Sequence, residues 1–366
     1  MLSAILNKQL NYSPRKLIAI CLLLLTIISL ASIYSSLHQA GKMAEQDIFY
    51  KEIIWVVIAW LFLIIISSVN YRIWFDFAYV LYAVNIVLLL AVDLFGRRAL
   101  GAQRWLSIGG FNFQPSELSK FIMIFVLARF FAHDINKGFV KGVLFPFSLV
   151  MINVLLIAKQ PDLGTALILI FLFFLMGFAS ANKKKYFVII ILSAIMLSPF
   201  AWNHLKDYQK KRLVVFMNPN AEPLGAGYTI IQSKIAIGSG QFFGKGFLSG
   251  TQNQFNFLPE RHTDFIFTVI AEEWGFLGCF FLFLIYMTII NNITRIAGYQ
   301  KDNFAKFVVL GTAYLFFLHV FINIGMTLGI LPVVGVPLLF VSYGGTHLLI
   351  SFMLLGIFFN ISRRRF

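Results

Sequence analysis

The sequence predicts an all-α, polytopic integral membrane protein with ten transmembrane helices and a large outer loop between helices 7 and 8. Of its 366 residues, 59% are hydrophobic and only 12% are charged, a composition too apolar for a soluble fold of this length. Apolar runs long enough to cross about 30 Å of hydrocarbon recur along the chain. We therefore expect one membrane domain over residues 1–366, in which residues 204–264 form the outer loop.

The first apolar run, residues 17–33, follows a basic start that contains Lys8, Arg15 and Lys16. No small-residue cleavage site follows this run, so we expect an uncleaved membrane helix rather than a signal peptide. Further spans are expected near residues 53–69, 75–95, 116–133, 143–158, 163–180, 187–203, 265–290, 307–329 and 339–360.

The distribution of Lys and Arg predicts how these helices are oriented. Basic residues concentrate at both ends of the chain and in every second short connection, which is typical of cytoplasmic segments. We therefore expect both termini in the cytoplasm and residues 204–264 outside. That loop holds seven basic and four acidic residues, which favours an anionic partner at the outer surface. The alternative is a basic face that touches anionic lipid headgroups.

The end of the outer loop collects ionisable residues beside a membrane helix. Lys245, Glu260, Arg261, His262 and Asp264 precede the span that begins near residue 265. Asp264 is placed to cap that helix, and the helix N-terminus would also keep its carboxylate ionised and able to accept a proton. Capping does not explain the neighbouring charges, so we expect a functional site here.

Other charged residues lie where membrane spans begin. Glu117 and Lys120 are three residues apart and share a helix face, so we expect them to pair, either as a packing lock or as part of a site. Asp162 follows Pro161 and is expected to cap the next helix while facing the same cavity as Asp264. Glu272 lies about 12 Å further along its helix than Asp264 and is expected to make a structural pair.

Two further segments carry either a site or a packing role. Arg104 and Trp105 lie in an outer connection, where they suit a phosphate and a sugar ring, or the headgroup layer of the membrane. Residues 335–337 and 342–346, which include Ser342, interrupt the last span with Gly, Pro and small residues. Close helix packing explains them, and so does an irregular backbone that lines a cavity.

Several of these segments together resemble the SEDS family (shape, elongation, division and sporulation). The matching stretches include GAQRWLSIG from residue 101, FQPSELSKF from 113, QPDLGTA from 160, GTQNQFNFLPERHTDFIFTVIAEEWG from 250 and NIGMTLGILPVVGVPLLFVSYGGT from 323. Leu339 and His347 depart from the family's usual proline and small residue. The similarity extends over nearly the whole chain from the third span onward.

The resemblance implies a peptidoglycan glycosyltransferase in the bacterial cytoplasmic (inner) membrane, which polymerises lipid II during cell elongation and rod-shape maintenance. It implies a class B penicillin-binding protein and other elongation-complex membrane proteins as partners, with no nucleic acid. By family, Asp264 is the essential acid of the outer loop, and Glu117, Lys120 and Asp162 line or brace the central cavity.

Residues and resemblance together give a mechanism in which Asp264 acts as general base on a sugar hydroxyl. The candidates for binding substrate are Arg104, Trp105, Lys120, Lys234, Lys245 and Arg261. The sequence identifies no certain cofactor, and a divalent cation at the diphosphate is left open because no ligand cluster with metal-like spacing appears. The alternatives are a lipid II flippase, which would place charges along the full membrane depth, and a scaffold for the crosslinking partner.

Overall fold

The computed structural model describes residues 14–38, 43–99, 102–108, 111–132, 138–180, 184–204, 207–223, 225 and 227–363. Each of the ten expected spans coincides with a helix. These helices are α2 (Pro14–Leu37), α3 (Met43–Ser68), α4 (Arg72–Phe95), α5 (Pro115–Ala132), α6 (Phe145–Lys159), α7 (Leu163–Ala179), α8 (Lys185–His204), α12 (Ile266–Gly298), α13 (Asn303–Thr327) and α14 (Gly345–Arg363). A π-helical turn, Val140–Leu144, leads into α6.

Seven helices of the described part of the chain are long and apolar enough to cross a membrane. Helices α7 and α8 are apolar over shorter stretches, and α5 carries Glu117, Lys120 and Arg129 within 18 residues. The protein is therefore an all-α, multi-pass membrane protein, as the sequence predicts, while the number of ten crossings stays a prediction.

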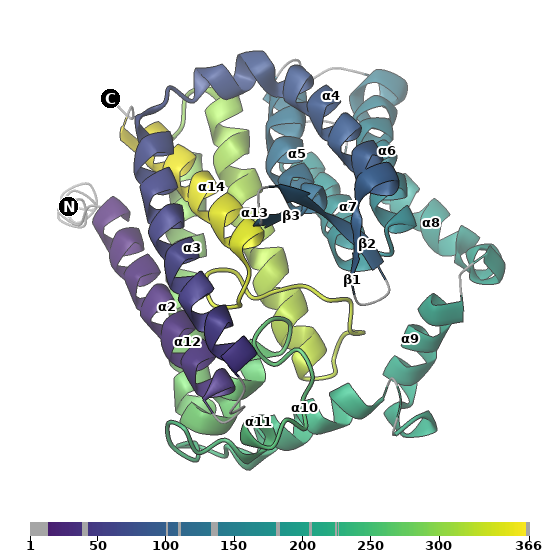
Figure 1. Cartoon of the computed structure of the whole chain (residues 1–366). Coiled ribbons are helices and arrows are strands. Elements are labelled where there is room, and N and C mark those ends of the chain that lie inside the picture. Colours follow the sequence, from purple (N-terminus) through teal and green to yellow (C-terminus); the bar gives the residue numbers. More distant parts are fainter. Residues whose placement is uncertain are drawn as a thin grey trace, which may run out of the picture.

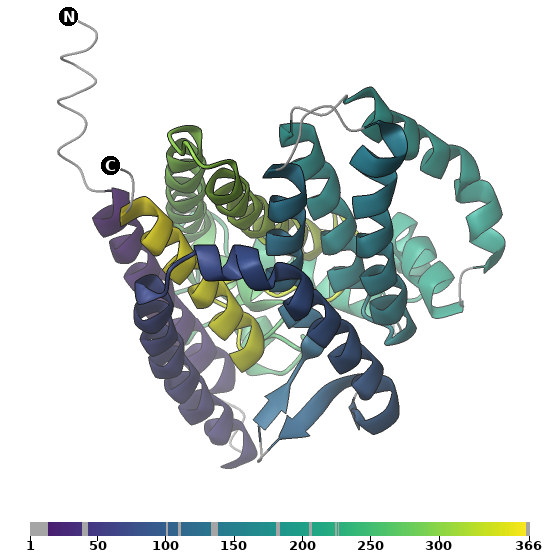
Figure 2. The same cartoon turned by 90° about the horizontal axis from the view of Figure 1, so that it is seen from above.

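Helix α13 lies at the centre of the bundle. It contacts α5, α7, α12 and α14, and most of its side chains are buried. Helices α2, α3, α12 and α14 lie on one side of it and α4 to α8 on the other (Figures 1 and 2). The start of α2 and the end of α14 lie near one end of the bundle in Figure 1, and the long loop lies at the opposite end.

The long loop between α8 and α12 is partly helical. It contains α9 (Asp207–Met217), a 3-10 turn (Pro219–Ala221), α10 (Tyr228–Ser239) and the short α11 (Thr251–Gln254). The apolar stretch at 228–237, too short to span a bilayer, forms α10 and packs on α12 and α13. The loop therefore lies against the end of the bundle.

A small antiparallel sheet follows α4 and was not expected from the sequence. Its strands are β1 (Arg97–Ala99), β2 (Ala102–Ile108) and β3 (Phe111–Phe113), in the order β1-β2-β3. Arg97 lies opposite Trp105 in the register. The sheet lies beside the first turn of α5, so it carries Arg104 and Trp105 over the helix ends.

The expected last span, 339–360, is wrong at its start. Helix α14 begins only at Gly345, and residues 328–344, which we call the 328–344 segment, run through the bundle without forming a helix. Gly335 and Gly344 take positive φ angles of 74° and 151°, which a residue with a side chain rarely adopts. The Pro and Gly residues of this apolar stretch stop the helix, and the segment is free to line a cavity.

Helix α12 is broken at Gly275, which has φ 65° and ψ −161°. The amides of Phe276 and Leu277 donate instead to the carbonyls of Gln241 and Phe242, at 2.9 and 3.1 Å. A Cβ on Gly275 would lie 2.3 Å from the backbone nitrogen of Gly244. The loop after α10 is therefore held against the break by backbone contacts that leave no room for a side chain.

We expect Gly275→Ala to lower the free energy of unfolding by about 1–3 kcal/mol or more, because the φ/ψ region is unfavourable for alanine and its methyl group would overlap Gly244. Thermal unfolding in detergent measures the effect. Gly298→Ala is the matched control, since a Cβ there meets nothing within 4 Å. Equal unfolding temperatures for the two variants would contradict this account of the break.

Candidate functional site

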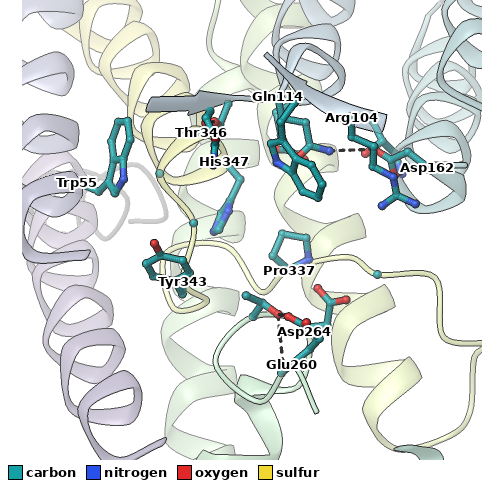
Figure 3. Close-up of a pocket in the computed structure, with 18 of the residues that line it drawn as sticks. Trp55, Arg104, Gln114, Asp162, Glu260, Asp264, Pro337, Tyr343, Thr346 and His347 are labelled. Atoms are coloured by element: carbon teal, nitrogen blue, oxygen red, sulfur yellow. Dashed lines mark hydrogen bonds between the residues drawn. The ribbon is translucent and has the colours of Figure 1, made fainter. Parts of the chain in front are cut away.

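A cavity of about 640 Å³ opens where the sheet, the 328–344 segment and the end of the long loop meet. Figure 3 shows Asp264 and Glu260 on one side of it, across from Gln114, Arg104 and Asp162. Its walls also include Lys51 and Trp55 of α3, Arg97 and Trp105 of the sheet, Glu117, Thr165, Thr263, Gly335, Pro337, Tyr343, Thr346 and His347. The lining is thus polar and aromatic, within a largely apolar protein.

Four helices begin at this cavity. Its walls include residues at or within one turn of the N-termini of α5, α7, α12 and α14: Gln114, Asp162, Asp264 and Thr346. The first amides of a helix lack partners inside it and carry partial positive charge. These helix ends add partial positive charge to a wall that also carries the carboxylates of Glu117, Asp162, Glu260 and Asp264.

Asp264 lies two residues before α12 and is half-buried in the cavity wall. Its carboxylate accepts no hydrogen bond from the described residues, and α12 has no side-chain cap, so the capping role considered from the sequence is not observed. Burial and the neighbouring Glu260 carboxylate raise the pKa of Asp264 to about 6, and the charges of Arg104 and Arg212 oppose that rise. Near neutral pH the group is mostly ionised yet close enough to its pKa to take up a proton.

The backbone around Asp264 is held by a single side chain of α13. The amide of Asn323 donates to the Asp264 carbonyl at 2.9 Å and to the Val336 carbonyl at 2.8 Å. A Cβ on Gly335 would lie 3.2 Å from the Asp264 carboxylate, so the glycine lets the 328–344 segment pass close beside it. The carboxylate is thus fixed in the wall by its backbone and stays available to a ligand.

Arg104 reaches the cavity from β2. Its Nε donates to the Gln160 carbonyl at 3.1 Å and a second nitrogen donates to the Pro161 carbonyl, so the turn between α6 and α7 holds the guanidinium in place. Trp105 follows it on the same strand and also lines the cavity. A fixed guanidinium beside an aromatic ring suits a phosphate group next to a sugar.

Asp162 caps α7 and lines the cavity, the two features expected from the sequence. One carboxylate oxygen accepts from the Thr165 amide at 3.2 Å. The other accepts from Gln114 at 3.1 Å and Ser116 at 2.9 Å. With these partners Asp162 ties the start of α7 to the start of α5, which makes it a brace of the cavity wall.

Glu117 and Lys120 form a buried pair, with 2.7 Å between Lys120 Nζ and a Glu117 carboxylate oxygen. Glu117 lines the cavity, whereas Lys120 lies behind it, 3.1 Å from His319 Nε2. The predicted pairing is therefore present, and Lys120 itself does not reach the cavity.

The other candidates for binding substrate lie away from the cavity. Lys234 is exposed on α10, where its chain covers Gly329. Lys245 pairs with Glu272 at 2.8 Å, and Arg261 is buried with its Nε on the Ser36 carbonyl at 2.6 Å. Because Lys245 is in an ion pair and Arg261 is hydrogen-bonded to a backbone carbonyl, these two residues hold the loop to the helices rather than face a ligand.

Glu272 and Ser342 have structural contacts. Glu272 is fully buried and accepts from Lys245, Thr251, the Gln252 amide and Asn253, which fastens α11 to α12. The Ser342 hydroxyl accepts from the Leu338 amide at 2.8 Å and helps to fold the 328–344 segment. Neither residue lines the cavity.

Sequence reasoning missed several residues of the cavity wall, above all Lys51 and Trp55 of α3 and Gln114, whereas Tyr343 and Thr346 belong to the 342–346 stretch for which a cavity-lining role was considered. Lys51 lies next to Glu52 at the start of an apolar span, and charges in that position are a signal that was available. Trp55 has no such signal, because aromatic residues are common in membrane helices. Within the described ranges no group of three or more His, Cys, Asp or Glu side chains is arranged to hold a metal ion.

Comparisons with known proteins agree over almost the whole chain. The family profile described as "Cell cycle protein", which covers FtsW, RodA and SpoVE, matches residues 15–365. The chain is 40% identical over 349 residues to the peptidoglycan glycosyltransferase MrdB of Escherichia coli (strain K12), covering 94% of this chain and 92% of that protein.

Solved structures share the fold. A chain from a study of how a peptidoglycan synthase complex coordinates polymerization and crosslinking matches with a TM-score of 0.81 and 28% identity, over 95% of this chain and 97% of that one. The rod shape determining protein RodA of Thermus thermophilus matches with a TM-score of 0.71 and 25% identity, over 95% and 96% of the two chains.

We expect Lys120→Met to lower the free energy of unfolding by about 3–5 kcal/mol, because it leaves the Glu117 carboxylate buried without its partner. Adding Glu117→Gln should recover most of the loss, since no buried charge then remains. Lys211→Met, which breaks the exposed 2.7 Å pair with Glu222, is the control and should change stability by less than about 1 kcal/mol. Thermal unfolding distinguishes these variants; a double variant as unstable as Lys120→Met would show that charge burial is not the cause.

Proposed function

The chain belongs to the FtsW/RodA/SpoVE (SEDS) family, and on that premise we propose that it is a peptidoglycan glycosyltransferase that polymerises lipid II. The observation that carries this proposal is Asp264, a carboxylate with a pKa of about 6, in a cavity where Arg104 and four helix N-termini offer positive charge to a diphosphate. A base beside an anion site is what sugar transfer from a diphosphate-linked donor requires.

In the proposed reaction, the hydroxyl of one saccharide attacks the anomeric carbon of the other, whose diphosphate leaves. Asp264 takes the proton of the attacking hydroxyl as the new C–O bond forms. The bond from the anomeric carbon to the diphosphate oxygen breaks, and its electron pair leaves with undecaprenyl diphosphate. The configuration at that carbon inverts, since attack and departure occur on opposite faces.

The cations and the aromatic residues of the cavity wall have different roles in the proposed reaction. Arg104, which the Gln160 and Pro161 carbonyls hold in place, is the cation that we assign to stabilising the departing diphosphate. Arg97 and Lys51 are further cations of the cavity wall. Trp105 and Trp55 offer aromatic faces to the sugar rings. Lys120, Lys234, Lys245 and Arg261 are not assigned to substrate, because the cavity wall does not include them.

The setting of the reaction follows from the predicted topology. We place the cavity and residues 204–264 at the outer face of the bacterial cytoplasmic membrane and both termini in the cytoplasm, which the Lys and Arg distribution supports. A class B penicillin-binding protein is the proposed partner, together with other elongation-complex membrane proteins, because a similar chain occurs in a peptidoglycan synthase complex. The flippase alternative is not favoured, since the relatives are named glycosyltransferases.

We expect Asp264→Asn to abolish formation of glycan polymer from purified lipid II, a loss of at least about 100-fold, because an amide cannot take the proton. The assay uses the purified chain with and without its class B partner, and polymer is separated by length on gels. Lys234→Gln is the matched control and should retain activity. An Asp264→Asn protein as active as the wild type would refute the assignment of the base.

The pH profile of polymerisation should have an acidic limb near pH 6, set by the pKa of Asp264. The base works when ionised, so activity falls as the pH drops through that pKa. Glu260→Gln removes the neighbouring negative charge that raises this pKa, so the limb should move to lower pH. Glu222→Gln, an exposed carboxylate paired with Lys211, should leave the limb in place. If Glu260→Gln leaves the acidic limb at the same pH, the limb reports the titration of a group other than Asp264.

A further inference from the structure

A fully buried histidine connects two walls of the cavity without lining it. His319 lies on α13 with no exposed surface. Its Nε2 lies 3.1 Å from Lys120 Nζ and its Nδ1 lies 3.0 Å from the Pro337 carbonyl. Lys120 in turn pairs with Glu117 at 2.7 Å. Glu117 and Pro337 both line the cavity, so an unbroken chain of polar contacts runs from one wall to the other behind it.

The partners of His319 determine which of its ring nitrogens carries the proton. The Lys120 ammonium group has only protons to donate, so Nε2 must accept. The Pro337 carbonyl has only lone pairs, so Nδ1 must donate. One neutral tautomer satisfies both, and the donors then point in one direction from Lys120 through His319 to Pro337. Hydrogen bonds aligned in this way polarise and strengthen each other.

The Pro337 carbonyl belongs to the non-helical 328–344 segment, so no helix satisfies it. The side-chain amide of Asn323, one turn further along α13, donates hydrogen bonds to the neighbouring Val336 carbonyl and to the Asp264 carbonyl. His319 and Asn323 therefore secure two successive carbonyls of the wall that passes beside the Asp264 carboxylate. Of the two, only His319 also reaches the Glu117–Lys120 pair of α5.

We propose that His319 is a positioning residue, which through Lys120 and Pro337 holds Glu117 and the Gly335–Pro337 wall in register with Asp264. This inference rests on the proposed function of the cavity. Because His319 does not touch the cavity, it acts on the alignment of the reacting groups rather than on substrate affinity. Its loss should therefore lower kcat and leave KM nearly unchanged.

The test compares His319→Leu with His319→Gln in the lipid II polymerisation assay. Leucine has no polar atoms, whereas the glutamine amide can accept from Lys120 with its oxygen and donate to Pro337 with its nitrogen. We expect His319→Leu to lower kcat about 100-fold with KM within about two-fold, and His319→Gln to recover most of that loss. Thr312→Val is the matched control and should retain activity, because among the described residues the buried hydroxyl that it removes is bonded only to the Val308 carbonyl of its own helix.

A second measurement is independent of activity. Thermal unfolding is compared for His319→Leu, Lys120→Met and the double variant, and we expect non-additive shifts because both changes break the same chain of contacts. An unchanged kcat in His319→Leu, a loss confined to KM, or no recovery in His319→Gln would overturn the proposal while leaving the proposed function intact. If the wild type makes no polymer, the proposed function fails, and additive unfolding shifts would then overturn the connection through His319 as well.

Discussion

A non-helical segment inside a membrane bundle is stable only where its backbone groups find partners, and in this protein α13 provides those of the part that passes beside Asp264. His319 and Asn323 lie four residues apart on α13 and satisfy the carbonyls of Pro337 and Val336. The same Asn323 amide holds the backbone of Asp264. The position of the Asp264 carboxylate beside the 328–344 segment depends on this face of a buried helix, while Ser29 of α2 and Tyr286 of α12 donate to the Val341 and Leu339 carbonyls further along the segment.

The charges of the protein divide into two groups with different surroundings. Lys120 and Arg261 are buried and have partners that offset the cost of burying a cation, and Lys245, which is exposed, pairs with the buried Glu272. These contacts join helices and loop to one another. Arg97 and Arg104 are carried by the small sheet to the cavity. The basic residues of the cavity wall are thus Arg97 and Arg104 of the sheet together with Lys51 of α3, whereas Lys120, Lys245 and Arg261 have structural contacts.

The helices could be predicted because membrane spans depend on length and hydrophobicity, which are local properties. The start of α14 could not, since residues 339–341 are apolar enough to belong to a span although they lie in the non-helical segment, which ends at Gly344 with its φ of 151°. The sheet was missed because two of its strands have only three residues each.

Of the predicted site residues, those at helix starts or beside Pro turns, such as Asp162, Glu117 and Asp264, do line the cavity. Lys234 and Lys245 do not, because their position depends on the path of a long loop.

The break at Gly275 also has a mechanical consequence. At 33 residues, or about 50 Å, α12 is longer than the hydrocarbon of a bilayer, about 30 Å. Before the break its side chains are covered by protein, and after it Phe276 and Phe280 face outward. A bilayer that thins or thickens acts on the outward-facing part, which can change its tilt at the glycine. The part next to Asp264 is fastened by Glu272, whereas the part after the break donates through the Tyr286 hydroxyl to the Leu339 carbonyl of the 328–344 segment, so a change in its tilt reaches the cavity wall.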